Sequence, residues 1–184
     1  MDKKLISVKT VVAIGIGAAL MFVLNRFVAI PSGVPNTNLN FGIAILTVFS
    51  AIFGPIAGFL IGFIAHTLVD LTSGWGVWWT WVIGSALYGC AVGIFFKLYK
   101  IEQGEFGVKQ AITINCVQIL SNFLVWAAIA PTLDILVYSE PANKVYLQGM
   151  VAASLNAAVV LILGTLLAFG YSKTRTKAGT LKAE

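Results

Sequence analysis

Apolar residues run along almost the whole chain in long segments that are separated by short polar stretches. The apolar segments fall at about 8–29, 41–53, 54–70, 77–97, 109–130 and 146–172. A helix needs about 20 apolar residues to cross the hydrocarbon core of a bilayer. The pattern therefore predicts an all-α integral membrane protein whose residues 1–184 form one membrane domain.

The stretch from 41 to 69 is ambiguous, because its length suits either one long helix or two short ones. Gly54-Pro55 lies near its middle and is a strong break signal. With two helices here the chain has six spans, and ten of its twelve Lys and Arg fall on one side together with both termini. Cytoplasmic loops are enriched in Lys and Arg. We therefore expect six transmembrane helices with both termini cytoplasmic, and Arg26 and Lys144 near the outer face.

Composition supports the membrane assignment and removes several classes of function. Only 10% of the residues are charged and 59% are hydrophobic, whereas a soluble domain carries about 25% charged residues. The net charge is +5, but the basic residues form no basic face interleaved with aromatic residues, so nucleic-acid binding is not expected. The two cysteines, Cys90 and Cys116, lie far apart in apolar segments and indicate neither a metal site nor a disulfide.

The chain also lacks the chemistry of a membrane enzyme or a pump. The predicted spans are nearly free of ionisable residues in their middle, where proton relays and ion sites place them. There is no HExxH motif, no phosphate-binding loop and no second histidine at metal-ligand spacing from His66. We expect no catalytic residue, no metal and no cofactor, and no ATP hydrolysis by this chain alone.

The remaining polar and aromatic residues indicate a ligand site. The stretch HTLVDLTSGWGVWWTW, residues 66–81, holds the only His, an Asp at i+4 and four of the five Trp. Amide side chains share one face of the fifth predicted helix, and two more share a face of the sixth. Amides with aromatic walls suit a flat ring that is neutral or weakly charged. The candidate substrate-binding residues are Asn36, Asn40, His66, Asp70, Trp78, Trp79, Gln118, Asn122, Trp126 and Asn156.

Structural alternatives remain open for many of these residues. Tryptophans at a membrane interface often form an aromatic belt, which is the favoured interpretation for Trp75 and Trp81. Of the adjacent Trp78 and Trp79, one is expected to face inward and one the lipid. Three further structural alternatives are that His66 bonds Asp70 and joins two helices, that Asn115 makes a helix–helix hydrogen bond, and that Asn122 and Trp126 serve packing. Small residues at four-residue spacing, as at Gly54, Gly58 and Gly62, favour close helix packing.

The whole chain resembles the S components of energy-coupling factor (ECF) vitamin transporters. The segments AIFGPIAGFLIGFIAH, APTLDILVYSEPANKVYLQG and YSKTRTK resemble the subgroup associated with uptake of hydroxymethylpyrimidine or pyridoxine. The resemblance implies a bacterial cell-membrane subunit that binds a small heterocyclic vitamin from outside with high affinity. Its partners would be a transmembrane coupling protein and two ATP-binding subunits.

Two site assignments follow from the resemblance. The loop AIPSGVPNTNLN, residues 29–40, matches the family's gating first loop. Small residues of the first helix would dock onto the coupling protein, through either Ala13 and Gly17 or Gly15 and Ala19. The alternative function is a channel or facilitator that works without partners.

Overall fold

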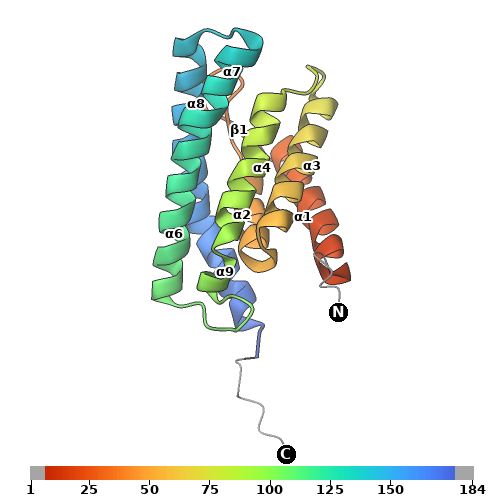
Figure 1. The fold of residues 1–184 in the computed structure, drawn as a ribbon, viewed down its shortest axis with the longest axis vertical. Coiled ribbons are helices and arrows are strands. Elements are labelled where there is room, and N and C mark those ends of the chain that lie inside the picture. The colour runs from red at the N-terminus through yellow and green to blue at the C-terminus, as the bar shows by residue number, and fades with distance from the viewer. Residues whose placement is uncertain (1–6, 177–184) are drawn as a thin grey trace, which may run out of the picture.

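The structure is a computed structural model that describes residues 7–176. It is an elongated bundle of helices, in which α1 begins and α9 ends at the same end (Figure 1). The elements in chain order are α1 (Val8–Phe27), β1 (Ile30–Pro31), β2 (Asn38–Leu39), α2 (Gly42–Phe53), α3 (Pro55–Ser73), α4 (Trp79–Ile94), α5 (Phe96–Tyr99), α6 (Val108–Asn122), η1 (Phe123–Ile129), α7 (Ala130–Tyr138), α8 (Ala142–Val159), η2 (Val160–Gly164) and α9 (Thr165–Lys173).

Four helical stretches of the described chain are long and apolar enough to cross a membrane. They are α1, α3, the continuous stretch Val108–Tyr138 and the continuous stretch Ala142–Lys173. The helices α2 and α4 are apolar but shorter, with 12 and 16 residues. These helices agree with the prediction of a helical membrane protein. The count of six spans and the cytoplasmic position of both termini remain predictions.

The chain turns between α2 and α3 at the expected break. Gly54 has φ +87°, a backbone conformation that favours glycine, and Pro55 opens α3, where its missing N–H is not needed. Further along, α3 and α4 pack backbone to backbone. A Cβ on Gly58 would overlap the Gly89 carbonyl, and a Cβ on Gly62 would overlap that of Ser85. The four-residue glycine spacing therefore packs α3 against α4, as small residues do in membrane helices.

The fifth predicted helix is longer than the sequence indicated. We expected it to end near residue 130, before a loop of residues 130–144, but the structure continues as helix to Tyr138. The segment before Pro131 is the π-helix η1, which has a wider turn than an α-helix. Pro131 follows at the start of α7, where proline is tolerated. Asp134 and its neighbours are therefore helical rather than part of a loop.

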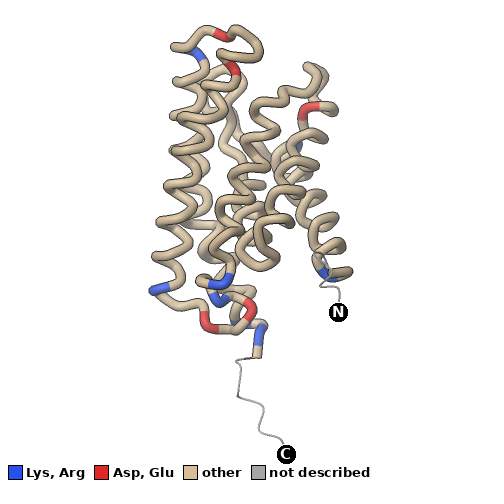
Figure 2. Tube along the Cα trace, viewed as in Figure 1, with Lys and Arg blue, Asp and Glu red and all other residues tan. Residues whose placement is uncertain are grey.

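Charged residues gather at the two ends of the bundle (Figure 2). Lysines and arginines cluster at the end where α1 begins and α9 ends. Acidic residues are found at this end and also at the opposite end. Lys3, Lys4, Lys177 and Lys182, which contribute to the predicted orientation, lie outside the described residues.

Candidate binding cavity

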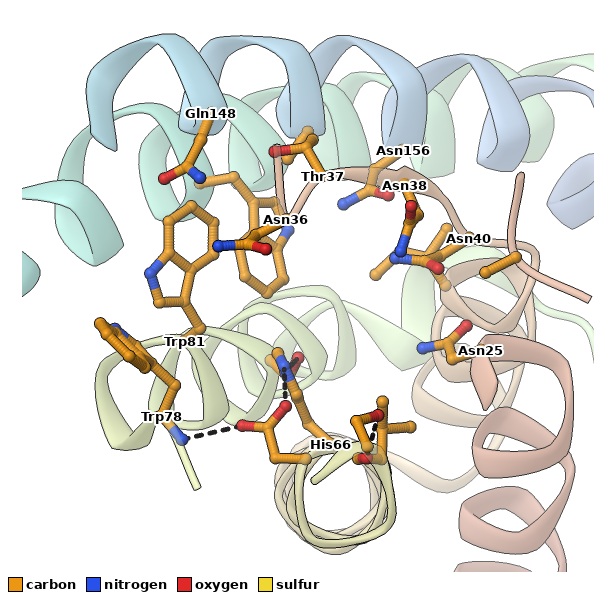
Figure 3. Close-up of a pocket in the computed structure, with 18 of the residues that line it drawn as sticks. Asn25, Asn36, Thr37, Asn38, Asn40, His66, Trp78, Trp81, Gln148 and Asn156 are labelled. Carbon is orange, nitrogen blue, oxygen red and sulfur yellow. Dashed lines mark hydrogen bonds and ion pairs between the residues drawn. The ribbon is translucent and has the colours of Figure 1, made fainter. Parts of the chain in front are cut away.

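A cavity of about 460 Å³ opens at the end of the bundle opposite the start of α1. Cavities of about 300–1,000 Å³ are typical of small-molecule sites. It lies between α1, the first loop (residues 29–40), the start of α2, α3, α4, the η1–α7 stretch and α8, so segments far apart in the sequence contribute to one site. Figure 3 shows amide side chains from the first loop and α8 facing His66, Trp78 and Trp81 across this space.

The first loop is a small β-hairpin over the cavity. β1 and β2 pair antiparallel, with Ile30 opposite Leu39. The turn is closed by the Ser32 hydroxyl, which donates to the Thr37 carbonyl at 2.6 Å. On its far side, Gln148 of α8 donates from Nε2 to the Pro35 carbonyl at 2.7 Å. The loop is thus internally ordered and is tied to α8 across the cavity.

The aromatic wall is organised by Asp134, a residue that is only 2% exposed. Its carboxylate accepts hydrogen bonds from the indole N–H groups of Trp78 at 2.8 Å and Trp81 at 2.7 Å, and from the Thr80 hydroxyl. Trp81 in turn stacks on Trp126, with ring centroids 5.7 Å apart. Because two indoles share one fixed acceptor, their rings are held in place before a ligand enters.

His66 and Asp70 form a polar part of the lining beside the aromatic wall. They lie one turn apart on α3 and share a face. The Asp70 carboxylate accepts the backbone N–H of Trp78 at 2.9 Å, and His66 Nδ1 lies 2.6 Å from the Ser85 hydroxyl. His66 Nε2 is 3.7 Å from Asp70 Oδ1, which is an ion-pair distance but too long for a hydrogen bond.

One buried polar atom of the lining has no hydrogen-bond partner among the described residues, the indole Nε1–H of Trp126. The side-chain amide of Asn156, a residue of α8 that is 6% exposed, points into the cavity in Figure 3. Buried polar groups in folded proteins are nearly always hydrogen-bonded, so both groups are candidates for contact with a ligand.

Most of the predicted site residues meet at this cavity. The structure brings together Asn36, Asn40, His66, Asp70, Trp78, Trp126 and Asn156.

The other three predicted residues lie outside the cavity lining. Trp79 is 47% exposed and stacks on Phe63, on the outside of α4. Gln118 is buried and donates to the Ala157 carbonyl, and Asn122 donates to Gln118 Oε1 at 2.8 Å. These amides hydrogen-bond each other and α8, which is the helix–helix role that lipid-embedded amides often have, although Asn122 Oδ1 has no partner among the described residues.

The cavity also contains residues that the sequence prediction assigned elsewhere or did not include. Trp81 was expected in an aromatic belt, and Asp134 in a loop, but both line the cavity. Asn25 and Gln148 line it as well. A signal for Gln148 was available, because it lies eight residues before Asn156 and therefore on the same helical face. Asp134 carried no such signal, since it follows a proline that predicted the end of the helix.

The two candidate docking pairs on α1 face different surroundings. Ala13 and Gly17 are buried, and a Cβ on Gly17 would lie 2.8 Å from side-chain atoms of Ile61 and Phe49. Gly15 and Ala19 are exposed, and a Cβ on Gly15 would meet no atom within 4 Å. Only the second pair is therefore free for contact with another molecule.

Comparisons with known proteins agree with a membrane binding subunit. The sequence model of the family "ECF-type riboflavin transporter, S component" matches residues 5–173. Among curated bacterial proteins, the UPF0397 protein of Lacticaseibacillus casei is 49% identical over 183 residues, which cover 100% of this chain and 98% of the relative. A UPF0397 protein of Staphylococcus aureus is 50% identical over the full length of both chains. No solved structure matches the chain.

S components are integral membrane proteins that bind the substrate of an ECF transporter, while partner subunits hydrolyse ATP. The family match covers nearly the whole chain, including every element that lines the cavity. The chain therefore belongs to the family of S components of ECF-type riboflavin transporters.

Proposed function

We propose that the chain captures a small, flat nitrogen heterocycle, hydroxymethylpyrimidine or pyridoxine, for import by an ECF transporter. The observation that carries this proposal is the cavity beneath the first loop, which is lined by a Trp81–Trp126 stack, by a Trp126 N–H without a partner among the described residues, and by the amide of Asn156. Stacking and a few placed hydrogen bonds are the usual means of holding such a ring.

Charge supports entry of the ligand from the outer side. Figure 2 shows Lys and Arg clustered at the end of the bundle where α1 begins and α9 ends, remote from the cavity. The segments at this end carry Lys9, Lys97, Lys100, Lys109, Lys173 and Arg175. By the positive-inside rule this end is cytoplasmic, so the cavity opens outward. The first loop would then be the lid of the site, and the exposed Gly15–Ala19 face of α1 would contact the transmembrane coupling protein.

Binding and transport separate this proposal from a channel or facilitator. The purified chain in lipid nanodiscs is titrated with hydroxymethylpyrimidine, pyridoxine and riboflavin, with intrinsic tryptophan fluorescence as the signal. We expect saturable binding of one of the two small rings, no flux into liposomes that contain the chain alone, and ATP-dependent uptake when the coupling protein and the two ATP-binding subunits are added. Flux without partners would establish the facilitator instead.

A variant pair tests whether this cavity is the site. Asn156→Ala removes an amide from the lining, whereas Asn143→Ala makes the same change at an exposed position on the same helix that does not line the cavity. We expect a loss of affinity of about five- to a hundredfold for Asn156→Ala and none for Asn143→Ala. Equal affinity of both variants would show that the ligand binds elsewhere.

A further inference from the structure

Asp70 is a buried carboxylate that the protein itself leaves incompletely paired. Asp70 Oδ2 accepts the Trp78 backbone N–H at 2.9 Å, but Oδ1 has His66 Nε2 at 3.7 Å as its nearest charged neighbour. His66 is held on its other side by the Ser85 hydroxyl. Asp70 is 4% exposed, and a buried carboxylate is costly unless it is paired and hydrogen-bonded. One oxygen of Asp70 therefore remains available to a donor in the cavity.

The other charges around the cavity do not neutralise Asp70. The second buried carboxylate, Asp134, already has three donors from α4 and the residue before it. The cations in the lining are at its exposed rim, where Lys144 pairs with Glu140 at 2.7 Å and Arg26 donates to the Thr72 carbonyl at 3.3 Å. Within the described residues, no buried lysine or arginine lines the cavity. The site is thus complementary to a ligand that brings positive charge.

Other parts of the lining supply donors. The Trp126 N–H, which has no partner among the described residues, and the NH2 group of Asn156, which lines the cavity, can both donate to a ligand acceptor. The ring of Trp81, which stacks on Trp126, offers a flat surface for a planar ligand. A matching ligand has donors on the edge that faces Asp70 and acceptors on another edge.

We infer that the cavity selects a protonated amidine edge, as in a 4-aminopyrimidine, and disfavours rings whose polar edge carries carbonyl groups. This inference rests on the proposed function and narrows it to the aminopyrimidine. An amidinium carries N–H donors and a positive charge on one edge, as an arginine does, so it can donate to the available Oδ1 of Asp70 and balance its charge at the same time. A pyrimidinone or a flavin has a carbonyl oxygen beside its ring N–H on this edge and carries no positive charge, so its contact with Asp70 includes a repulsive acceptor–acceptor pair.

Two ligands of nearly the same shape test the inference. The full chain in nanodiscs is titrated with hydroxymethylpyrimidine and with its 4-oxo analogue, in which a carbonyl replaces the exocyclic amine. We expect the wild-type chain to bind the amino form about ten- to a hundredfold more tightly, as for a hydrogen bond to a charged group. Equal affinities, or a preference for the oxo form, would overturn the inference.

The variant Asp70→Asn assigns the preference to one side chain. Its amide oxygen still accepts the Trp78 N–H, while the negative charge is lost. We expect it to weaken binding of the amino form and to leave the oxo form little changed, so that the preference disappears. Glu102→Gln makes the same chemical change beside Lys9, at the other end of the bundle, and is expected to leave both affinities unaltered.

The outcomes separate this inference from the proposed function. A preference that persists in Asp70→Asn would overturn the role of Asp70. Tight binding of pyridoxine or riboflavin without discrimination between the two pyrimidines would overturn the inference and leave a heterocycle-binding subunit standing. Failure of every heterocycle to bind the wild-type chain would reject both. If Asp70→Asn does not insert as a folded protein, the wild-type preference alone decides.

Discussion

Two glycines of α1, only two residues apart, are expected to respond in opposite ways to the same substitution. Gly17 is buried and a Cβ there would lie 2.8 Å from Ile61 Cδ1 and from Phe49 Cδ1, which is closer than side chains normally approach. Gly15 is exposed and a Cβ there would meet nothing within 4 Å. Leucine at each position therefore tests internal packing against partner contact on one helix.

The expected sizes follow from these surroundings. Gly17→Leu forces α1 away from α2 and α3, and overpacking of this kind costs about 1–3 kcal/mol of stability. Gly15→Leu meets no neighbour in the chain, and leucine is favoured over glycine in a helix by about 0.5–1 kcal/mol. We therefore expect a lower melting temperature for Gly17→Leu, and an unchanged or slightly higher one for Gly15→Leu.

Three assays on both variants complete the experiment: thermal unfolding, ligand titration, and ATP-dependent uptake by the reconstituted transporter. Gly15→Leu is expected to keep its stability and its ligand affinity but to lose uptake, because a bulky side chain prevents close helix approach at the exposed face. Normal uptake by Gly15→Leu would refute docking through this face. Loss of ligand affinity in the same variant would refute the separation of the two surfaces.

Two further variants probe the cavity itself. Gln148→Leu removes the hydrogen bond from α8 to the Pro35 carbonyl, so we expect faster ligand dissociation in stopped-flow fluorescence; an unchanged dissociation rate would show that this bond does not hold the first loop. Trp81→Ala should reduce ligand affinity because Trp81 stacks on Trp126 in the cavity, whereas Trp79→Ala, at an exposed ring that stacks on Phe63, should leave it unchanged in calorimetric titration, and the opposite ranking would place the aromatic wall on the other face of α4.

Hydropathy and break signals were sufficient to predict a helical membrane protein and the break between α2 and α3 at Gly54-Pro55. Polar side chains in an apolar helix must face protein or a cavity, and this rule predicted that His66, Asp70 and Asn156 are shielded from lipid. The same rule does not separate a cavity from a contact between helices. Gln118 and Asn122 hydrogen-bond each other, and Gln118 also bonds α8; the sequence offers no sign that these partners lie within reach.

The tryptophans were assigned less well for a related reason. A tryptophan near a membrane interface is most often part of a belt, and adjacent positions in 78–81 differ only in the side of the helix to which they point. Trp81 lies in the cavity because Asp134 accepts its N–H at 2.7 Å. Asp134 lies 53 residues further along the chain than Trp81, after a π-helical segment. Pro131 predicted the end of the helix there, so the sequence did not indicate that Asp134 is helical.

The walls of the cavity differ in how firmly the fold holds them. The wall formed by α3 and α4 is fixed by backbone contact at Gly58 and Gly62, so the carboxylate of Asp70 and the indole of Trp81 are positioned without a ligand. The first loop, in contrast, is joined to α8 by a side-chain hydrogen bond from Gln148, and such a bond contributes only about 0.5–1.5 kcal/mol. Recognition groups on the rigid wall preserve selectivity, while a weakly tied loop permits entry. We therefore expect substitutions in the α3–α4 wall to change which ligand binds, and substitutions in the loop to change how fast it exchanges.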